Sequence, residues 1–293
     1  MSEQPSGLVV VDKPAGITSH DVVARVRRLA GTRKVGHAGT LDPMATGVLV
    51  LGVNRATRLL GHLMLTDKRY DATVRLGVTT STDDAEGERL TSTSAADVGE
   101  EQVRAALTAY VGEIDQVPSA VSAIKVDGKR AYQRVRDGET VTLPARRVTV
   151  HDIAVHDVTP AGEEPALDVR LSVHCSSGTY IRAIARDLGE ALGVGGHLTA
   201  LRRTAVGEFD LATASTLEEL AESFRMLGLD DAARRTFPQI ELNEEQARAV
   251  RVGRPLELQL ADSPSAVFAP DGQFLALYEQ RGECARPVAV FTG

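Results

Sequence analysis

The chain has 293 residues, of which 43% are hydrophobic and 25% charged, so it can bury a substantial core and is not a disordered polypeptide. It carries 33 basic and 40 acidic groups, a net charge of −7, and its aromatic residues are 6 Phe and 5 Tyr without a Trp, which argues against a broad platform for stacking several bases. No apolar run approaches the roughly 18 residues of a membrane helix, and residues 1–7 lack the features of a secretory signal. We therefore expect a cytoplasmic protein with no membrane partner.

Basic residues are concentrated in three segments of this acidic chain. Residues 1–70 carry 10 basic and 5 acidic groups, residues 125–150 carry 7 and 3, and residues 182–203 carry 4 and 2. A polyanion responds to the local field, so an acidic protein can bind RNA through a basic cleft. Charge also varies in this way along ordinary solvated faces of proteins. The three segments indicate an RNA-binding cleft only because the distinctive motifs lie in them.

The first part of the chain alternates buried strands with helices. Gly7–Asp12 and Val48–Leu51 are apolar runs typical of buried strands. Between them, Thr18 or Ser19 can cap a helix whose apolar stripe is Val22, Val23, Val26 and Leu29. Asn54 is placed to cap a second helix that runs to about Leu63.

The middle of the chain contains longer strands. We expect strands over Lys68–Val78, Val148–Val158 and Ala166–Cys175, a polar surface loop over 79–97, a helix from Asp97 to Tyr110, and a helix from Thr179 that ends at Gly193. Strands and helices interleave without a regular alternation. This pattern favours an α+β fold with a mixed or antiparallel central sheet flanked by helices.

A domain boundary is predicted near Phe237-Pro238, which divides the chain into residues 1–237 and 238–293. Beyond it we expect a short helix from Asn243 to Gly253 and strands over Pro255–Leu260, Ala266–Ala269, Phe274–Glu279 and Pro287–Phe291, with a hairpin turn at Asp271-Gly272. A β-rich module of about 55 residues is marginal alone. We expect it to pack on the main body.

The most informative segment is KVGHAGTLDPMATG, residues 34–47, which leads into the strand at Val48. Its glycines permit tight turns and close approach of a ligand, and Pro43 restricts the backbone of Asp42. A carboxylate held in this way suits a nucleophile or a general base. An isolated Asp-Pro is usually only a turn, so the interpretation depends on the whole segment.

The segment GHAGTLDPMATG, residues 36–47, closely resembles the catalytic motif of the TruB family, tRNA pseudouridine synthases that act on the T-loop uridine, uridine 55 of tRNA. The resemblance extends in the family's order over residues 7–210, through DKPAGITS (12–19), DKRY (67–70), SAIK with GKRAY (122–132), CSSGTYIR (175–182) and HLTALRR (197–203). The region past Pro238 loosely resembles the family's small RNA-binding PUA module.

The resemblance implies an isomerase that needs no redox cofactor and no ATP. The N1–C1′ bond of uridine breaks, the base turns, and C5 joins C1′. Asp42 would be the ionised nucleophile, and attack at C6 of the base or at C1′ of the sugar are both open. Arg182 would pair with it; a cation in the first turn of a helix is disfavoured by about 0.3–1 kcal/mol, which a nearby carboxylate offsets. A surface arginine tolerated at that cost is the alternative.

Other roles are also implied by the resemblance. Tyr70 would stack on the extruded uracil and assist proton removal at C5, while Tyr180 and Leu201 would line the pocket; core packing is the alternative for all of them. His37 would fill the place of the flipped base, at a site where flipping costs a few kcal/mol. Lys13, in the Lys-Pro motif, would contact the substrate.

Residues 119–147 are expected to form a mobile thumb that becomes ordered when RNA binds. Within it, Gly128 and Gly138 bracket a hinge-like segment. Its basic residues would contact phosphates; they are Lys125, Lys129, Arg130, Arg134, Arg136, Arg146 and Arg147. No metal site is expected, because the cysteines are isolated and His151 with His156 lacks a third partner.

Two other functions compete with a tRNA-modifying enzyme. A non-catalytic RNA-binding or RNA-folding module would not need both Asp42 and Arg182. A synthase for another RNA, or one guided by accessory RNA and proteins, would keep both. The short C-terminal module and the compact N-terminus favour the stand-alone bacterial type, and we expect a monomer. A nucleotide-binding enzyme is poorly supported, because no Walker lysine motif and no strand-anchored G-x-G-x-x-G is present.

Overall fold

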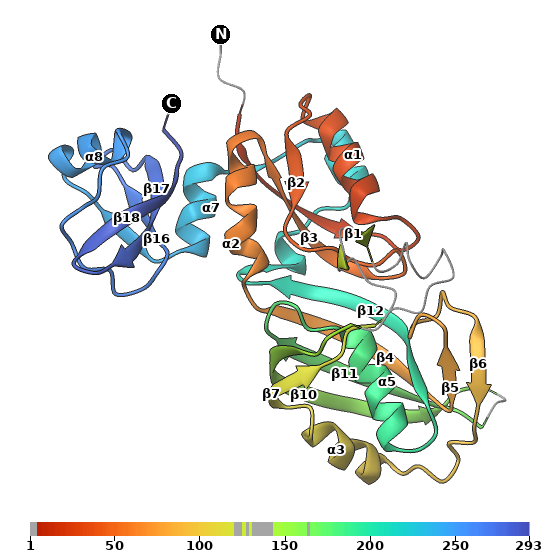
Figure 1. Ribbon diagram of the computed structural model, residues 1–293. Coiled ribbons are helices and arrows are strands. Elements are labelled where there is room, and N and C mark those ends of the chain that lie inside the picture. Colours follow the sequence, from red (N-terminus) through yellow and green to blue (C-terminus); the bar gives the residue numbers. More distant parts are fainter. Residues whose placement is uncertain (1–4, 120–124, 127–128, 131–142, 163–164, 293) are drawn as a thin grey trace.

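The computed structural model describes residues 5–119, 125–126, 129–130, 143–162 and 165–292. A ten-stranded sheet runs through the main body in the order β14-β1-β3-β12-β4-β11-β10-β7, with β2 paired to β3 and β13 paired to β12. Its strands are β1 (Gly7–Lys13), β2 (Val35–His37), β3 (Thr46–Val53), β4 (Lys68–Leu76), β7 (Gly112–Gln116), β10 (Arg146–Pro160), β11 (Leu167–Cys175), β12 (Gly196–Val206), β13 (Phe209–Asp210) and β14 (Leu227–Gly228). The sheet and its helices are drawn in Figure 1.

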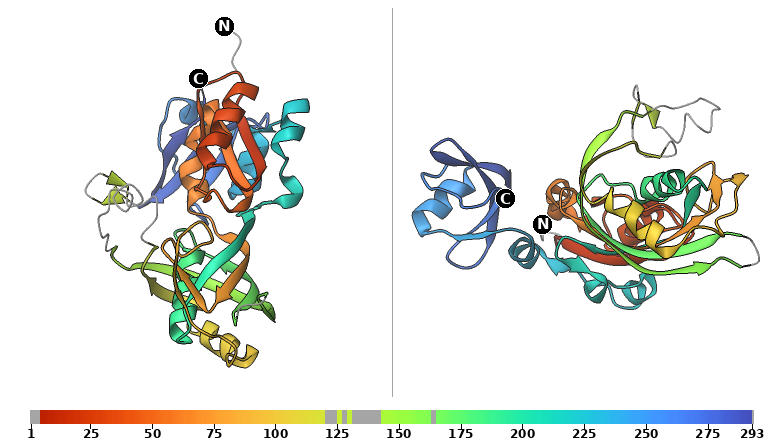
Figure 2. Two further views of the ribbon diagram at one scale, coloured as in Figure 1. Left: turned by 90° about the vertical axis from the view of Figure 1, so that its right-hand side faces the viewer. Right: turned by 90° about the horizontal axis from the view of Figure 1, so that it is seen from below.

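Helices cover both faces of this sheet. They are α1 (Ser19–Leu29), the 3-10 helix η1 (Asn54–Arg58), α2 (Leu60–Met64), α3 (Glu100–Thr108), α5 (Ile181–Ala191), the 3-10 helix η2 (Leu211–Thr213), α6 (Leu217–Glu222) and α7 (Leu229–Thr236). Two short hairpins, β5–β6 (Val78–Thr80, Arg89–Ser92) and β8–β9 (Lys125–Val126, Lys129–Arg130), lie outside the sheet. The strands curve around α3 and α5, as Figure 2 shows from below. The α+β class with a mixed sheet is therefore confirmed.

Alternate residues of the central strands belong to two cores. Val9 and Val11 of β1 belong to a core that also includes residues of α1, α3, α5 and α6. Leu8 and Val10 belong to a second core, on the other face, that includes residues of η1, α2 and α7. Successive side chains of a strand point to opposite faces, so a strand buried on both faces must be apolar throughout. This explains the uninterrupted run of valines in β1.

Residues after Phe237 form a second, four-stranded sheet in the order β15-β16-β17-β18, with α8 beside it. These elements are β15 (Gln239–Glu241), α8 (Glu244–Arg251), β16 (Ser265–Phe268), β17 (Phe274–Arg281) and β18 (Cys284–Val290). Phe268, Phe274 and Phe291 share a core with β1, β3 and α7. The guanidinium of Arg55 donates to the Phe291 carbonyl. The module therefore packs on the main body through apolar and polar contacts.

Several local predictions were wrong. Asn54 does not cap a helix: it has φ +54° and begins η1, and its amide nitrogen donates to the Pro5 carbonyl at 2.7 Å. Gly99, not Asp97, precedes α3 as its N-cap. Pro255–Leu260 forms only an isolated bridge, between Leu256 and Ala285. The predicted polar loop over 79–97 instead contains the β5–β6 hairpin and the buried Asp84.

No helix in the part of the chain that the structure describes has the length and apolar character needed to cross a bilayer.

Gly47→Ala should lower the free energy of unfolding by several kcal/mol. Gly47 has φ +100°, and a Cβ at this position would lie 2.2 Å from the Arg203 carbonyl oxygen on β12, so both backbone conformation and space require glycine. The matched control is Gly61→Ala in α2, where a Cβ would meet no atom within 4 Å. This control should be neutral or stabilising by up to about 1 kcal/mol. Chemical denaturation of both variants measures the difference, and equal stabilities would contradict the role of Gly47.

Candidate active site

A cavity of about 280 Å³ opens between the loop that follows β2, strands β4 and β12, and the segment that leads into α5. Its lining residues are Gly39, Thr40, Leu41, Asp42, Met64, Lys68, Tyr70, Ser176, Gly178, Thr179, Tyr180, Ile181, Arg182, Leu201 and Arg203. Five of the residues predicted to act on substrate lie here together: Asp42, Tyr70, Tyr180, Arg182 and Leu201. They come from positions up to 159 apart in the sequence, because 201 − 42 = 159. The sequence motifs therefore converge on one cavity.

The loop that carries Asp42 is held by hydrogen bonds between its backbone and side chains from other segments. Arg203 donates to the carbonyls of Gly39 and Thr40 at 3.2 and 3.4 Å. The Ser19 hydroxyl donates to the carbonyl of Leu41 at 3.1 Å and accepts from its amide at 2.9 Å. These bonds satisfy backbone polar groups of a partly buried loop. Asp42 is thus held in position before any ligand arrives, which limits the entropy lost on binding.

Arg182 pairs with two carboxylates. Its Nε lies 3.1 Å from Oδ2 of Asp42, and its Nη1 lies 3.1 Å from Oδ2 of Asp84. The Arg182 side chain is 6% exposed and that of Asp84 4%, whereas Asp42 is 34% exposed at the cavity wall. The Thr82 carbonyl also accepts from Arg182, at 3.0 Å. Asp42 thus remains the one member of this network with substantial access to a ligand.

Burial raises the pKa of Asp42 above the ordinary aspartate value of 3.8, and the positive charge of Arg182 opposes that rise. The negative charge of Asp84 raises it further. Removal from water disfavours the charged form of a carboxyl group, and a nearby cation restores it. Arg182 therefore favours the ionised form of a poorly solvated carboxylate and offsets part of the effect of burial on its pKa.

Two other cavity residues have perturbed acidities. Burial raises the pKa of Tyr70, so its phenol is neutral at physiological pH. Burial lowers the pKa of Lys68 to about 8, with the charge of Arg203 acting in the same direction. The Lys68 ammonium is held by the carbonyls of Met64 and Thr66. Tyr70 is therefore suited to contact a nucleobase as a neutral phenol rather than to act as a phenolate.

Tyr180 is the N-cap residue of α5, and its backbone is fixed by Gln116. The Gln116 side chain accepts from the Tyr180 amide at 2.8 Å and donates to its carbonyl at 3.1 Å. Leu201 is 8% exposed and packs with the main core as well as lining the cavity. Core packing and pocket lining are therefore compatible for Leu201.

Lys13 and His37 do not line the cavity. Lys13 is fully buried, and its ammonium donates to the carbonyls of Pro14, Ile17 and Pro43 at 2.9, 2.7 and 3.2 Å. The Lys13 ammonium thus holds the residue next to Asp42, and contact of Lys13 with substrate stays a prediction. His37 ends β2 and packs edge-on against His20, two residues before Gly39 of the cavity wall.

The predicted thumb is only partly described. The backbones of Lys125 and Arg130 pair in the β8–β9 hairpin, with Lys129 in its second strand. Gly128, Arg134, Arg136 and Gly138 lie outside the described residues. Arg146 and Arg147 begin β10, where the Arg147 guanidinium pairs with Glu113 at 2.8 Å.

The sequence analysis missed two residues of this site. Asp84 lies in a segment rich in Ser, Thr and Asp that resembles any solvated loop, and no sequence signal distinguishes it. Arg203 is 1% exposed and braces both Gly39 and the Val48 carbonyl, the latter at 2.7 Å. Its position at the end of the HLTALRR motif, residues 197–203, indicated that Arg203 is functionally relevant but did not indicate what it does.

Models of one protein family match consecutive parts of the chain. Residues 27–181 match the TruB family pseudouridylate synthase (N terminal domain). Residues 182–237 match the tRNA pseudouridylate synthase B C-terminal domain, and residues 237–292 match the tRNA pseudouridine synthase II C terminal model.

Relatives and solved structures agree with this match. tRNA pseudouridine synthase B of Arthrobacter sp. (strain FB24) is 60% identical, over 98% of this chain and 96% of its own. The protein of that name from Streptomyces griseus is 56% identical, over 99% and 100%. A chain of an H/ACA RNP bound to a substrate RNA containing 2′-deoxyuridine is similar in structure, with a TM-score of 0.72 at 25% identity over 98% of this chain and 85% of its own.

The fold and these similarities define an RNA-modifying isomerase that converts uridine to pseudouridine. Within that class, the chain belongs to the TruB family, whose members form pseudouridine in tRNA.

Proposed function

We propose that the enzyme converts the T-loop uridine of tRNA, uridine 55, to pseudouridine, with Asp42 as the nucleophile. The observation that carries the proposal is the ion pair between Asp42 and the buried Arg182, 3.1 Å apart in a cavity of about 280 Å³. A cavity of this size suits one nucleoside rather than a helical stem. The target uridine would therefore leave its stack and enter the cavity, at a cost of a few kcal/mol.

The reaction requires no external reactant. Attack by Asp42 on the nucleotide, at C6 or C1′, accompanies cleavage of the N1–C1′ bond. The uracil turns, C5 bonds to C1′, and the bond to Asp42 breaks to release the carboxylate. The C5 proton leaves, and N1 is protonated. Tyr70 would contact the turning base as a neutral phenol. Arg182 would keep Asp42 ionised when substrate displaces water from the cavity. His37 remains a proposal for filling the vacated place in the RNA.

Two alternatives are weighed against this proposal. A non-catalytic RNA-binding module has no use for a partly exposed carboxylate supported by a buried guanidinium, because such burial is costly without a function. A guided synthase would keep the same site. Because a structural relative belongs to an H/ACA RNP, the experiment must also test whether this enzyme needs a second RNA.

The decisive experiment is incubation of the full-length protein with an unmodified tRNA transcript, followed by mapping of pseudouridine at single-nucleotide resolution. We expect one new pseudouridine, at uridine 55, without guide RNA or accessory protein. The matched control is the same transcript with cytidine at that position, which should remain unmodified. Modification elsewhere, or only after addition of a second RNA, would contradict the T-loop assignment.

Neutralising Lys129 and Arg130 together should weaken tRNA binding and flatten its salt dependence. If both side chains contact phosphates, the slope of log K against log salt should fall by about 1.4–1.8, because each contact contributes about 0.7–0.9. The control is Arg104→Gln, which removes a basic residue of α3 that pairs with Glu100 at 2.6 Å. Binding measured over a range of salt concentrations checks the prediction, and an unchanged slope would remove the thumb from the interface.

The region after Phe237 is proposed to contact the same RNA as a PUA-like module, and the enzyme to act as a cytoplasmic monomer. The shared core around Phe274 and Phe291 supports a fixed placement of the module beside β1.

A further inference from the structure

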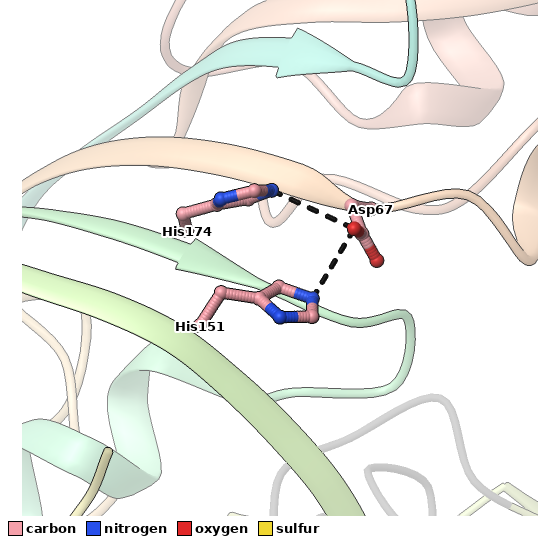
Figure 3. A group of neighbouring side chains, drawn as sticks. All are labelled: Asp67, His151 and His174. Carbon is pink, nitrogen blue, oxygen red and sulfur yellow. Dashed lines mark ion pairs between the residues drawn. The ribbon is translucent and has the colours of Figure 1, made fainter. Parts of the chain in front are cut away.

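Three potential metal ligands meet on the side of the central sheet that faces away from Tyr70. They are Asp67, immediately before β4, His174 of β11 and His151 of β10 (Figure 3). Tyr70 packs against the core, and side chains alternate along β4, so Asp67 points to the opposite face. The group is therefore separate from the catalytic cavity.

Strand pairing explains why these residues meet. In β4 and β11, Arg69 pairs with His174 and Lys68 with Cys175, which brings Asp67 close to His174. A register shift in β10 leaves His151 as an extra residue between Val150 and Asp152. Bulges of this kind redirect a side chain. Neighbouring strands thus deliver three ligands from a rigid support, which a precise binding site requires.

The distances from the Asp67 carboxylate to the two imidazoles match those of a coordination shell. Oδ2 of Asp67 lies 3.2 Å from Nε2 of His151 and 3.6 Å from Nε2 of His174. Ligand atoms placed about 2.0–2.2 Å from a tetrahedral zinc ion lie roughly 3.3–3.5 Å apart. The ligand atoms of all three residues lie within 4.8 Å of one another. The rings point toward the same carboxylate, as Figure 3 shows.

We propose that Asp67, His151 and His174 bind a divalent transition-metal ion of the zinc class. Two imidazoles and one carboxylate suit zinc, cobalt and nickel, whereas magnesium and calcium prefer a shell of oxygens. Three protein ligands leave a coordination position for water. The side chains are 35–48% exposed, which gives the ion a path from solvent. Asp67 and His174 also line a cavity of about 330 Å³ that has room for an exchangeable ligand.

This inference goes beyond the earlier expectation of no metal site. That expectation considered only His151 and His156, which both lie on β10. The other two ligands of the proposed site, Asp67 and His174, come from elsewhere in the chain. His156 instead contacts the Ser172 hydroxyl, with 2.6 Å between Nε2 and Oγ. It therefore provides a histidine of the same strand that is not part of the proposed site.

Binding is tested on the untagged, full-length, metal-stripped protein by calorimetric titration with zinc sulfate, and by the visible spectrum after addition of cobalt chloride. We expect one zinc ion per chain, tetrahedral-type cobalt bands and an increase in melting temperature with zinc. Magnesium chloride should produce none of these effects. His151→Gln and His174→Gln should each weaken zinc binding by more than the roughly 10–100-fold that loss of an outer-shell partner costs.

His156→Gln is the matched control and should bind zinc as the unmodified protein does. Equal loss in all the histidine variants, or no stoichiometric binding to the unmodified protein, would overturn the proposal and leave an ordinary histidine–carboxylate ion pair. Pseudouridine formation is a separate readout. Because the metal site lies away from Tyr70, activity should survive treatment with a chelator even where zinc binding is confirmed.

Discussion

Asp42→Asn should abolish pseudouridine formation while leaving tRNA affinity unchanged within a few-fold. The expected loss in rate is at least about four orders of magnitude, the scale on which enzymes respond to removal of a nucleophile. Asparagine keeps the shape of the side chain but cannot form the covalent intermediate. Single-turnover assays with an unmodified transcript measure the rate, and filter binding measures the affinity.

The folded state should tolerate this change. Arg182 retains Asp84 and the Thr82 carbonyl as partners, and burial of the Asp42 carboxylate is itself unfavourable. The free energy of unfolding should therefore fall by no more than about 1 kcal/mol. Asp157→Asn, which alters an aspartate of similar exposure (32%) paired with Arg170, controls for the substitution itself. A variant at position 42 with half the original rate would refute the nucleophile assignment.

Arg182→Met should lower the free energy of unfolding by about 3–5 kcal/mol, because it leaves the buried carboxylate of Asp84 without its cation. Activity should fall as well, since the cation that keeps Asp42 ionised is lost. The control is Arg186→Met, one turn later in α5, whose side chain is 27% exposed and whose pairs with Asp83 and Asp187 are more accessible. Its expected cost is about 1 kcal/mol or less.

Lowering the pH should reduce the penalty of Arg182→Met. Burial already raises the folded-state pKa of Asp42, and removal of Arg182 raises it further. A carboxyl group whose pKa is higher in the folded than in the unfolded state binds more protons when folded. The free energy of unfolding therefore rises as the pH falls from above the folded-state pKa toward the unfolded-state pKa. The double variant Arg182→Met with Asp84→Asn should regain part of the lost stability. A penalty that is independent of pH, with no rescue, would contradict the proposed network.

Elements with strong local signals were predictable from the sequence. Thr18 caps α1 and accepts from the Asp21 amide at 3.1 Å, and Gly193 follows α5 with φ +72°. Elements that depend on tertiary contacts were not predictable. Asn54 has the residue type of a cap, yet its side chain bonds to Thr32 and Pro5, and its backbone is left-handed. Local preference gave way there to contacts with distant segments.

The site shows the same division. Asp42 and Arg182 could be selected because they lie in motifs that resemble those of the TruB family. The glycines and the proline around Asp42 supported its selection, whereas the helix-start argument alone left Arg182 undecided. Asp84 could not be selected, because its burial depends on a partner 98 residues away, as 182 − 84 = 98. The meeting of Asp67 with two histidines depends on strand register and on a bulge at His151, neither of which is encoded by spacing along the chain.

Strand β12 has a consequence for how the enzyme is assembled during synthesis. It is the strand that joins β3 to β4, so without residues 196–206 the sheet would remain in two unconnected halves. One half carries Asp42, and the other carries Tyr70. A nascent chain can complete local hairpins early, but contacts between segments so distant form late. Catalytic competence should therefore emerge only after β12 has paired with both β3 and β4.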